Sequence, residues 1–172
     1  MGKKILLHDQ SSSCAFIYRT LPVIIAGFLF LFGTVNCGGN KSASQPPKKL
    51  IQDFIAKHQT MVDTSLANYY VQQERKDVAK RVQNSISAKK AEGTLESMQE
   101  ATFDFSDLKL TLIGEKEDYF NDELKTFIRV AVKGSYIMQQ QNSSQTIPAD
   151  ETIILEKVGD DWKVTEDMNP WG

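Results

Sequence analysis

The stretch Thr152-Ile-Ile-Leu-Glu-Lys-Val-Gly-Asp-Asp-Trp-Lys-Val164 joins two alternating segments through a Gly-Asp-Asp turn. Ile153 and Leu155 lie two positions apart before that turn, and Trp162 and Val164 lie two positions apart after it. Such alternation places one face of each segment in a core and is typical of a half-buried hairpin. The sequence therefore predicts strands over 151–158 and 162–165.

Two further strands are predicted upstream of this hairpin. The first spans 104–113, where three leucines alternate with polar residues, and the second is a long strand over 124–139. Gly134, in the middle of the long strand, predicts a bulge or a sharp bend. The charged stretch 114–122 and the polar stretch 140–146 are predicted to be a turn and a loop.

Helical spacing precedes the strands. From Pro47 or Lys48 onward, apolar residues recur three and four positions apart as far as Tyr70, which predicts an amphipathic helix. A second helix is predicted over about 72–90, ended by Gly93. The aromatic, β-branched run at 69–71 suggests a bend between them. Helices followed by antiparallel strands predict an α+β fold.

The chain resembles the nuclear transport factor 2-like superfamily over residues 48–167, most specifically in the stretch 152–164 quoted above. The resemblance implies a cystatin-like cone, in which amino-terminal helices pack on a curved four-stranded antiparallel sheet and Trp162 closes the core. Members of the superfamily include enzymes, ligand binders, assembly modules and many lipoproteins of unknown role. Function therefore does not follow from the resemblance alone.

An export signal is predicted over residues 1–36. Basic residues outnumber acids in the first 20 positions, and the next fifteen, 21–35, carry no charge. This apolar run is shorter than the roughly 20 residues that span a bilayer, and it fits the core of a signal peptide. The mature part, with 136 residues, has the length of one domain, predicted over 48–172.

Cys37 follows the apolar run and resembles the modified cysteine of bacterial lipoproteins. In that family the thiol receives a diacylglycerol and the chain is cut just before it. Thr34 and Asn36 depart from the usual leucine and small residue at these positions. Residues 37–47 would then form a lipidated tether, anchoring the domain outside the cytoplasm in the bacterial cell envelope. The alternatives are an uncleaved amino-terminal anchor or an ordinary signal peptide.

Charge and cysteine content exclude several classes of function. The whole chain has a formal net charge of −2 and its leader +2, so the mature part carries −4. A mildly acidic domain lacks the basic surface of a nucleic-acid binder. Since Cys14 lies in the leader, the mature chain has a single thiol and no internal disulfide. His58 is its lone histidine, so neither a zinc site nor any other cofactor is predicted.

Several side chains are candidates for a pocket or for packing. They are His58, Tyr69, Tyr70, Tyr136, Trp162 and Trp171. Asp63 and Glu151 have the chemistry for acid–base work, as do the three tyrosines, but nothing in their spacing brings them together, and no catalytic residue is predicted. The terminal Trp171 either folds back onto the cone or stays free as a partner contact.

Two hypotheses remain open. In the first, a non-catalytic, lipid-anchored envelope domain binds a partner protein or a small ligand at the open end of its cone. In the second, a small-molecule binder or enzyme uses an apolar pocket between the first helix and the sheet. A pocket with convergent polar groups would favour the second hypothesis, and a filled cone with an exposed apolar patch the first.

Overall fold

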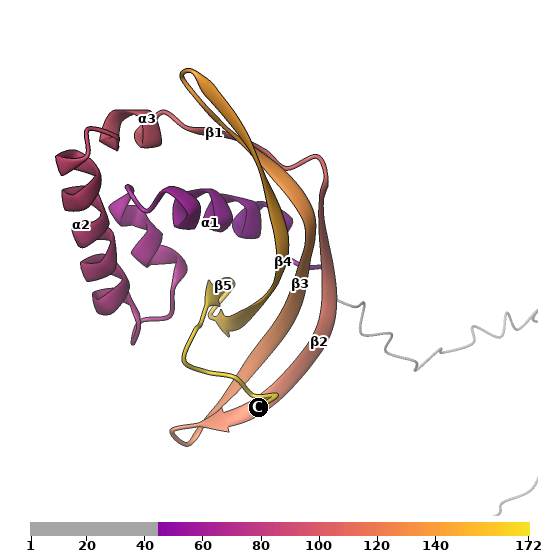
Figure 1. Ribbon diagram of the computed structural model, residues 1–172. Helices are drawn as coiled ribbons and strands as arrows, with labels where there is room; N and C mark the ends of the chain where they lie inside the picture. Colours follow the sequence, from indigo (N-terminus) through magenta and orange to yellow (C-terminus); the bar gives the residue numbers. More distant parts are fainter. Residues whose placement is uncertain (1–44) are drawn as a thin grey trace, which may run out of the picture. The chain divides into compact units, whose positions relative to one another are not determined.

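The computed structural model describes residues 45–172 (Figure 1). The predicted leader, Cys37 and most of the predicted tether lie outside these residues. The helices are α1 (Lys48–Thr60), the 3-10 helix η1 (Thr64–Tyr69), α2 (Arg75–Ala91) and α3 (Leu95–Gln99). The strands are β1 (Thr102–Asp104), β2 (Leu108–Phe120), β3 (Glu123–Gln140), β4 (Ser143–Val158) and β5 (Asp161–Val164). The fold is α+β, as predicted.

The first helix ends earlier than the apolar spacing predicts. Met61 adopts a left-handed conformation with φ of 49°, and its N–H bonds to the carbonyl of Lys57 at 2.8 Å. Asp63 then caps η1 by accepting a 2.8 Å hydrogen bond from the N–H of Ser65. The prediction of one continuous helix to Tyr70 is therefore wrong. α1 ends at Thr60, and a separate 3-10 helix follows after the turn at Met61–Asp63.

The second helix agrees with the prediction at its carboxyl end. It finishes at Ala91, and Gly93 adopts a left-handed conformation with φ of 72°. The expected bend at 69–71 is also confirmed. The N–H of Val71 makes no helical hydrogen bond and instead donates to the carbonyl of Val164 at 3.0 Å. This contact attaches the inter-helix segment to β5.

The described sheet has five antiparallel strands rather than the four predicted. The short strand β1 had no apolar alternation long enough to predict it. β3 lies at the centre: β4 pairs along one edge, and β2 and β1 share the other. β5 pairs only with the last residues of β4, Leu155–Val158.

Both predicted loops between the long strands are wrong. The charged stretch belongs to β2 as far as Phe120, and the turn is confined to Asn121 and Asp122, whose φ angles are 52° and 63°. The polar stretch belongs largely to β4, which pairs Ser143 with Gln140. Backbone pairing to the central strand β3 extends these hairpins, although their exposed side chains are polar or charged.

Gly134 causes no bulge, because the pairing of β3 with β4 passes through it without a register shift. A Cβ there would lie 2.3 Å from the carbonyl oxygen of Asp107, so the residue permits a close approach of two backbones. The irregularity lies instead in β2, between Leu112 and Gly114.

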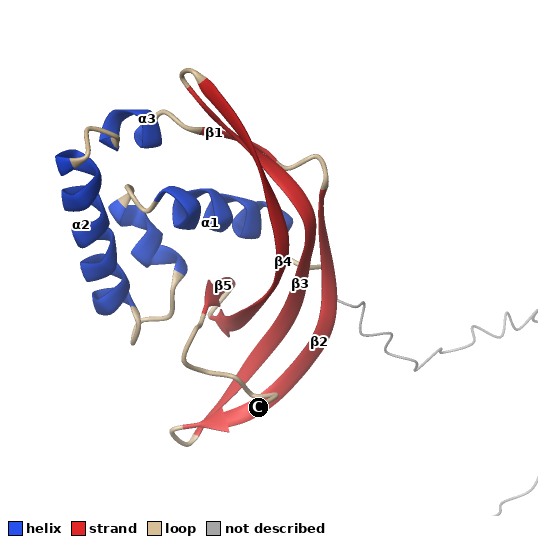
Figure 2. Cartoon of the chain, in the orientation of Figure 1, coloured by secondary structure: helices blue, strands red, loops and turns tan. Residues whose placement is uncertain are grey.

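One face of the sheet forms the core. β3 contributes Ile128, Val130 and Val132, all fully buried, and they join a cluster with Ile51 and Ile55 of α1. The sheet curves around α1, and α2 lies on the far side of that helix (Figures 1 and 2). Burying each such side chain contributes about 1.5–3 kcal/mol, so α1 is held in the hollow of the sheet.

Candidate functional site

A cavity of about 630 Å³ opens between α1 and β4. Its apolar wall comes from residues that also face the core, among them Phe54 and Ile55 of α1 and Ile153 of β4. β4 continues past the short strand β5, and the cavity is lined by residues of this unpaired part of β4 together with residues of α1. A ligand entering here would meet both helix and sheet.

Polar groups converge on the same cavity. The hydroxyl of Tyr136 donates a 3.0 Å hydrogen bond to Oε1 of Gln59, and both residues line it together with His58 and Glu151. Burial raises the pKa of Tyr136, and the nearby carboxylate of Glu151 raises it further. His58 is exposed, with its ring centroid 5.4 Å from that of Phe54.

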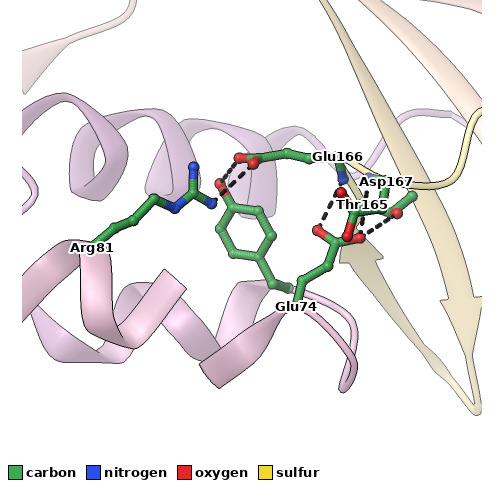
Figure 3. A network of polar contacts seen from close by, with 6 residues as sticks. Glu74, Arg81, Thr165, Glu166 and Asp167 are labelled. Carbon is green, nitrogen blue, oxygen red and sulfur yellow. Dashed lines mark hydrogen bonds and ion pairs between the residues drawn. The ribbon is translucent and has the colours of Figure 1, made fainter. Parts of the chain in front are cut away.

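Glu166 also lines the cavity, and Tyr70 and Arg81, which do not line it, bind its carboxylate. Figure 3 shows the contact of this carboxylate with Arg81. Oε1 of Glu166 accepts a 2.6 Å hydrogen bond from the hydroxyl of Tyr70, and its Oε2 accepts one of 2.9 Å from Arg81. Burial alone would raise the pKa of Glu166, but these two hydrogen bonds outweigh it and the pKa is lowered. Burial and the same carboxylate raise the pKa of Tyr70.

The backbone around Glu166 is fixed by Glu74, which lies just before α2 (Figure 3). The buried carboxylate of Glu74 accepts hydrogen bonds from the N–H groups of Glu166 and Asp167 at 2.9 and 3.3 Å. It also accepts one from the hydroxyl of Thr165 at 2.6 Å. These three hydrogen bonds fix the backbone at the rim of the cavity.

The charge of the cavity lining is negative. Asp150, Glu151 and Glu166 contribute carboxylates, and among residues 45–172 no lysine or arginine lines the cavity. Asp150 pairs with Lys133, and Glu166 pairs with Arg81. Within residues 45–172, Glu151 has no cation at ion-pair distance, so its carboxylate is the one available to a ligand.

Four other predicted candidates lie elsewhere. Tyr69 packs against Phe54 with ring centroids 6.4 Å apart but does not line the cavity. Trp162 is partly buried at the core, and the ammonium group of Lys157 lies 5.2 Å from its ring centroid. Asp63 pairs with Lys57, whose hydrogen bond lowers the pKa of Asp63 to about 2.

Trp171, the last of the four, folds back onto the sheet, but on the face opposite α1. Its ring lies 3.2 Å from where a Cβ of Gly114 would be, and the guanidinium of Arg129 lies 5.0 Å from the ring centroid. Gly114 pairs with Arg129. Arg129 is adjacent to the core-facing Val130, and successive side chains of a strand point to opposite faces, so Arg129 points to the other face. The tail thus covers the second face of the sheet instead of closing the cavity.

The sequence alone did not predict Gln59, Glu74, Arg81 or Glu166 as part of a site. Each is an ordinary polar residue of a helix or tail, and the partners lie 77 to 96 residues apart. A local pattern carries no signal for such contacts. The spacing of Tyr70 and Tyr136 likewise did not predict that both would lie within hydrogen-bond reach of cavity-lining residues.

In the described part of the chain, no cluster of three or more His, Cys, Asp or Glu residues could hold a metal ion. Among residues 45–172, no helix has the length and apolar character needed to span a bilayer. Models of known protein families, curated proteins and solved structures gave no match to this chain.

Proposed function

We propose that the protein is an exported, lipid-anchored envelope protein whose domain binds a ligand non-covalently in the cavity between α1 and β4. The observation that carries the proposal is the coexistence of an apolar wall with one available carboxylate, Glu151, in a cavity of about 630 Å³. Binding pockets combine apolar lining residues, which bury the body of a ligand, with a few placed polar groups that fix its orientation. The ligand is expected to combine an apolar body with a cationic group.

The same geometry favours binding over catalysis. The raised pKa of Tyr136 keeps its hydroxyl protonated, and that hydroxyl is already bonded to Gln59. The lowered pKa of Glu166 keeps its carboxylate ionised between its two donors, so it has no proton to donate and is a weak base. General acid–base catalysis works best with groups whose pKa lies near the working pH. We therefore assign these groups to the architecture of a binding site.

Two features support the family and the location. The curvature of the sheet around α1 and the hairpin of β4 and β5 are consistent with the cystatin-like cone of the nuclear transport factor 2-like superfamily (Figure 2). The apolar run 21–35 followed by Cys37 supports export and lipid attachment. Two acyl chains would hold the protein stably, whereas one gives marginal anchoring.

Mass spectrometry of the membrane-purified protein tests the location. The expected species begins at Cys37 and carries a diacylglycerol on its thiol. A chain that retains residues 1–36, or one with an unmodified thiol, would contradict lipid attachment. Replacing Cys37 with serine should release the protein from the membrane and leave the fold of 48–172 intact.

Benzamidine, an aromatic cation, tests the cavity. Titrated into the full-length protein in detergent, it is expected to shift the NMR resonances of His58, Gln59 and Glu151 saturably. Glu151→Gln should weaken this binding by about tenfold, the equivalent of 1.4 kcal/mol. Glu117→Gln is the matched control, because Glu117 is an exposed carboxylate of β2 outside the cavity. Equal effects of the two variants would refute a cavity site.

A further inference from the structure

We infer that the ligand is an extended basic peptide, which adds as a strand to the free edge of β4 and places a lysine or arginine beside Glu151. This inference rests on the proposed function, since it names the ligand of the same cavity. Strand addition is a recurrent mode of peptide recognition, in which main-chain hydrogen bonds give affinity and side-chain pockets give specificity.

Within residues 45–172, the edge of β4 that faces away from β3 is unpaired over most of its length. β3 pairs with β4 from Ser143 to Glu156, which occupies one edge. On the other edge β5 pairs only with Leu155–Val158. The cavity lies along this second edge, where Pro148 to Ile154 contribute seven consecutive residues to its lining.

The backbone of this edge is correctly oriented to receive a strand. The N–H of Thr165 donates a 3.1 Å hydrogen bond to the carbonyl of Ile154, which therefore points away from β3. In an antiparallel ladder the groups of every second residue point the same way, so those of Thr152 and Asp150 also face the open edge. Pro148 follows in this series and has no N–H, which limits the donors available beyond Asp150.

The chain itself stops short of this position. After Thr165 the backbone turns away from β4, because Glu74 holds the N–H groups of Glu166 and Asp167. A longer β5 would pair with Thr152, but in this structure the cavity lies beside Thr152 instead. A peptide bound there would extend β5 in the same sheet layer.

The negative charge of Glu151 favours a peptide with a basic residue opposite it. Glu151 pairs in register with Val132, a core-facing residue, so its side chain lies on the same face of the sheet as α1. A residue directly opposite Glu151 on an added strand would point to that same face. Opposite charges at such cross-strand positions stabilise pairing, and Glu151 is the lining carboxylate that has no ion-pair partner within residues 45–172.

Hydrogen exchange of the full-length protein in detergent tests the inference. The probe is a short capped peptide of alternating valine and threonine with one central lysine. On binding, the amide protons of Asp150 and Thr152 should exchange at least about tenfold more slowly, because each gains an acceptor at the edge. The amides of Glu151 and Ile153, which face β3, should change little and serve as internal controls.

Two altered peptides separate main-chain pairing from charge. Methylation of alternate peptide nitrogens removes the donors of one edge and should abolish the protection of Asp150 and Thr152. Replacement of the peptide lysine by glutamate should weaken binding by about tenfold or more. Glu151→Gln in the protein should remove most of this preference for lysine. Equal binding of the lysine and glutamate peptides would overturn the charge assignment.

The result with benzamidine distinguishes the two proposals. If benzamidine binds in the cavity and the lysine peptide does not protect Asp150 and Thr152, strand addition is overturned and the proposed binding function stands. If neither probe reaches the cavity, both proposals fail. Protection of the two amides without peptide, increasing with protein concentration, would assign the edge to a second copy of the chain and overturn the inference.

Discussion

The buried carboxylate of Glu74 accepts a 2.6 Å hydrogen bond from the hydroxyl of Thr165, which follows it by 91 residues. The same carboxylate receives the N–H groups of Glu166 and Asp167. The residue that precedes α2 is thereby joined to the end of β5. This contact fixes the direction in which the chain leaves the sheet and thus keeps the edge of β4 open.

Glu74→Ala is expected to reduce the free energy of unfolding by about 2–3 kcal/mol, because it leaves buried donors without an acceptor. Glu92→Ala is the control, since Glu92 is an exposed residue at the other end of α2 and should cost less than about 0.5 kcal/mol. Urea denaturation measures both. Equal losses in the two variants would show that the Glu74 hydrogen bonds contribute nothing to stability.

A buried ion pair gives a second prediction. Lys125 and Glu156 lie 3.0 Å apart with side-chain exposures of 9% and 7%, and Oε2 of Glu156 has no hydrogen-bond partner in the described structure. Lys125→Met should cost about 3 kcal/mol, because it leaves an uncompensated buried charge. The double variant Lys125→Met/Glu156→Leu should recover most of that loss. A double variant less stable than the single one would contradict this explanation.

The carboxyl-terminal tail provides a third prediction. Removing Met168–Gly172 uncovers the second face of the sheet, where Phe127 is fully buried and Trp171 contacts Gly114. The loss of buried apolar surface should cost about 2 kcal/mol and lower the melting temperature by roughly 5 °C or more. Trp171→Phe keeps a ring beside Arg129 and should cost less. An unchanged melting temperature in the truncated protein would mean that the tail is free.

The pH dependence of stability should include a contribution from Asp63. Its hydrogen bond from Lys57 lowers the pKa of Asp63 from 3.8 to about 2. A lowered folded-state pKa stabilises the fold above the unfolded-state value, and the contribution is lost as the pH falls from about 4 to 2. Because the pair is partly exposed, its contribution is below about 1 kcal/mol.

Asp63→Asn isolates this ion pair, because asparagine can still accept the hydrogen bond from the N–H of Ser65 that caps η1. The variant should be slightly less stable than the wild type at neutral pH and equally stable near pH 2. Asp63→Ala removes the cap as well and should be less stable at every pH. Parallel stability curves for wild type and Asp63→Asn would exclude a role for the pair.

Local sequence patterns predicted the ends of elements that are set by the residues at those ends. Gly93 ends α2 through its left-handed conformation, and the Gly-Asp-Asp turn joins β4 to β5. The lengths of β2 and β4 were not predictable in this way. Charged and polar side chains dominate the distal hairpins, so the apolar alternation disappears although backbone pairing to β3 continues. The five-residue helix α3 had too few residues for any periodicity to be evident.

Residue spacing along the chain was enough to predict the α+β class, a helix that begins at Pro47 or Lys48, the end of α2 and the last hairpin. Helix spacing, strand alternation and turn chemistry are properties of neighbouring residues, so they can be read without the fold. Three relationships required the fold itself: the hydrogen bond of Tyr136 to Gln59, the position of Glu166 between Tyr70 and Arg81, and the edge of β4 that is unpaired within residues 45–172. These relationships depend on strand register and sheet curvature, which are set by packing between segments far apart in the chain.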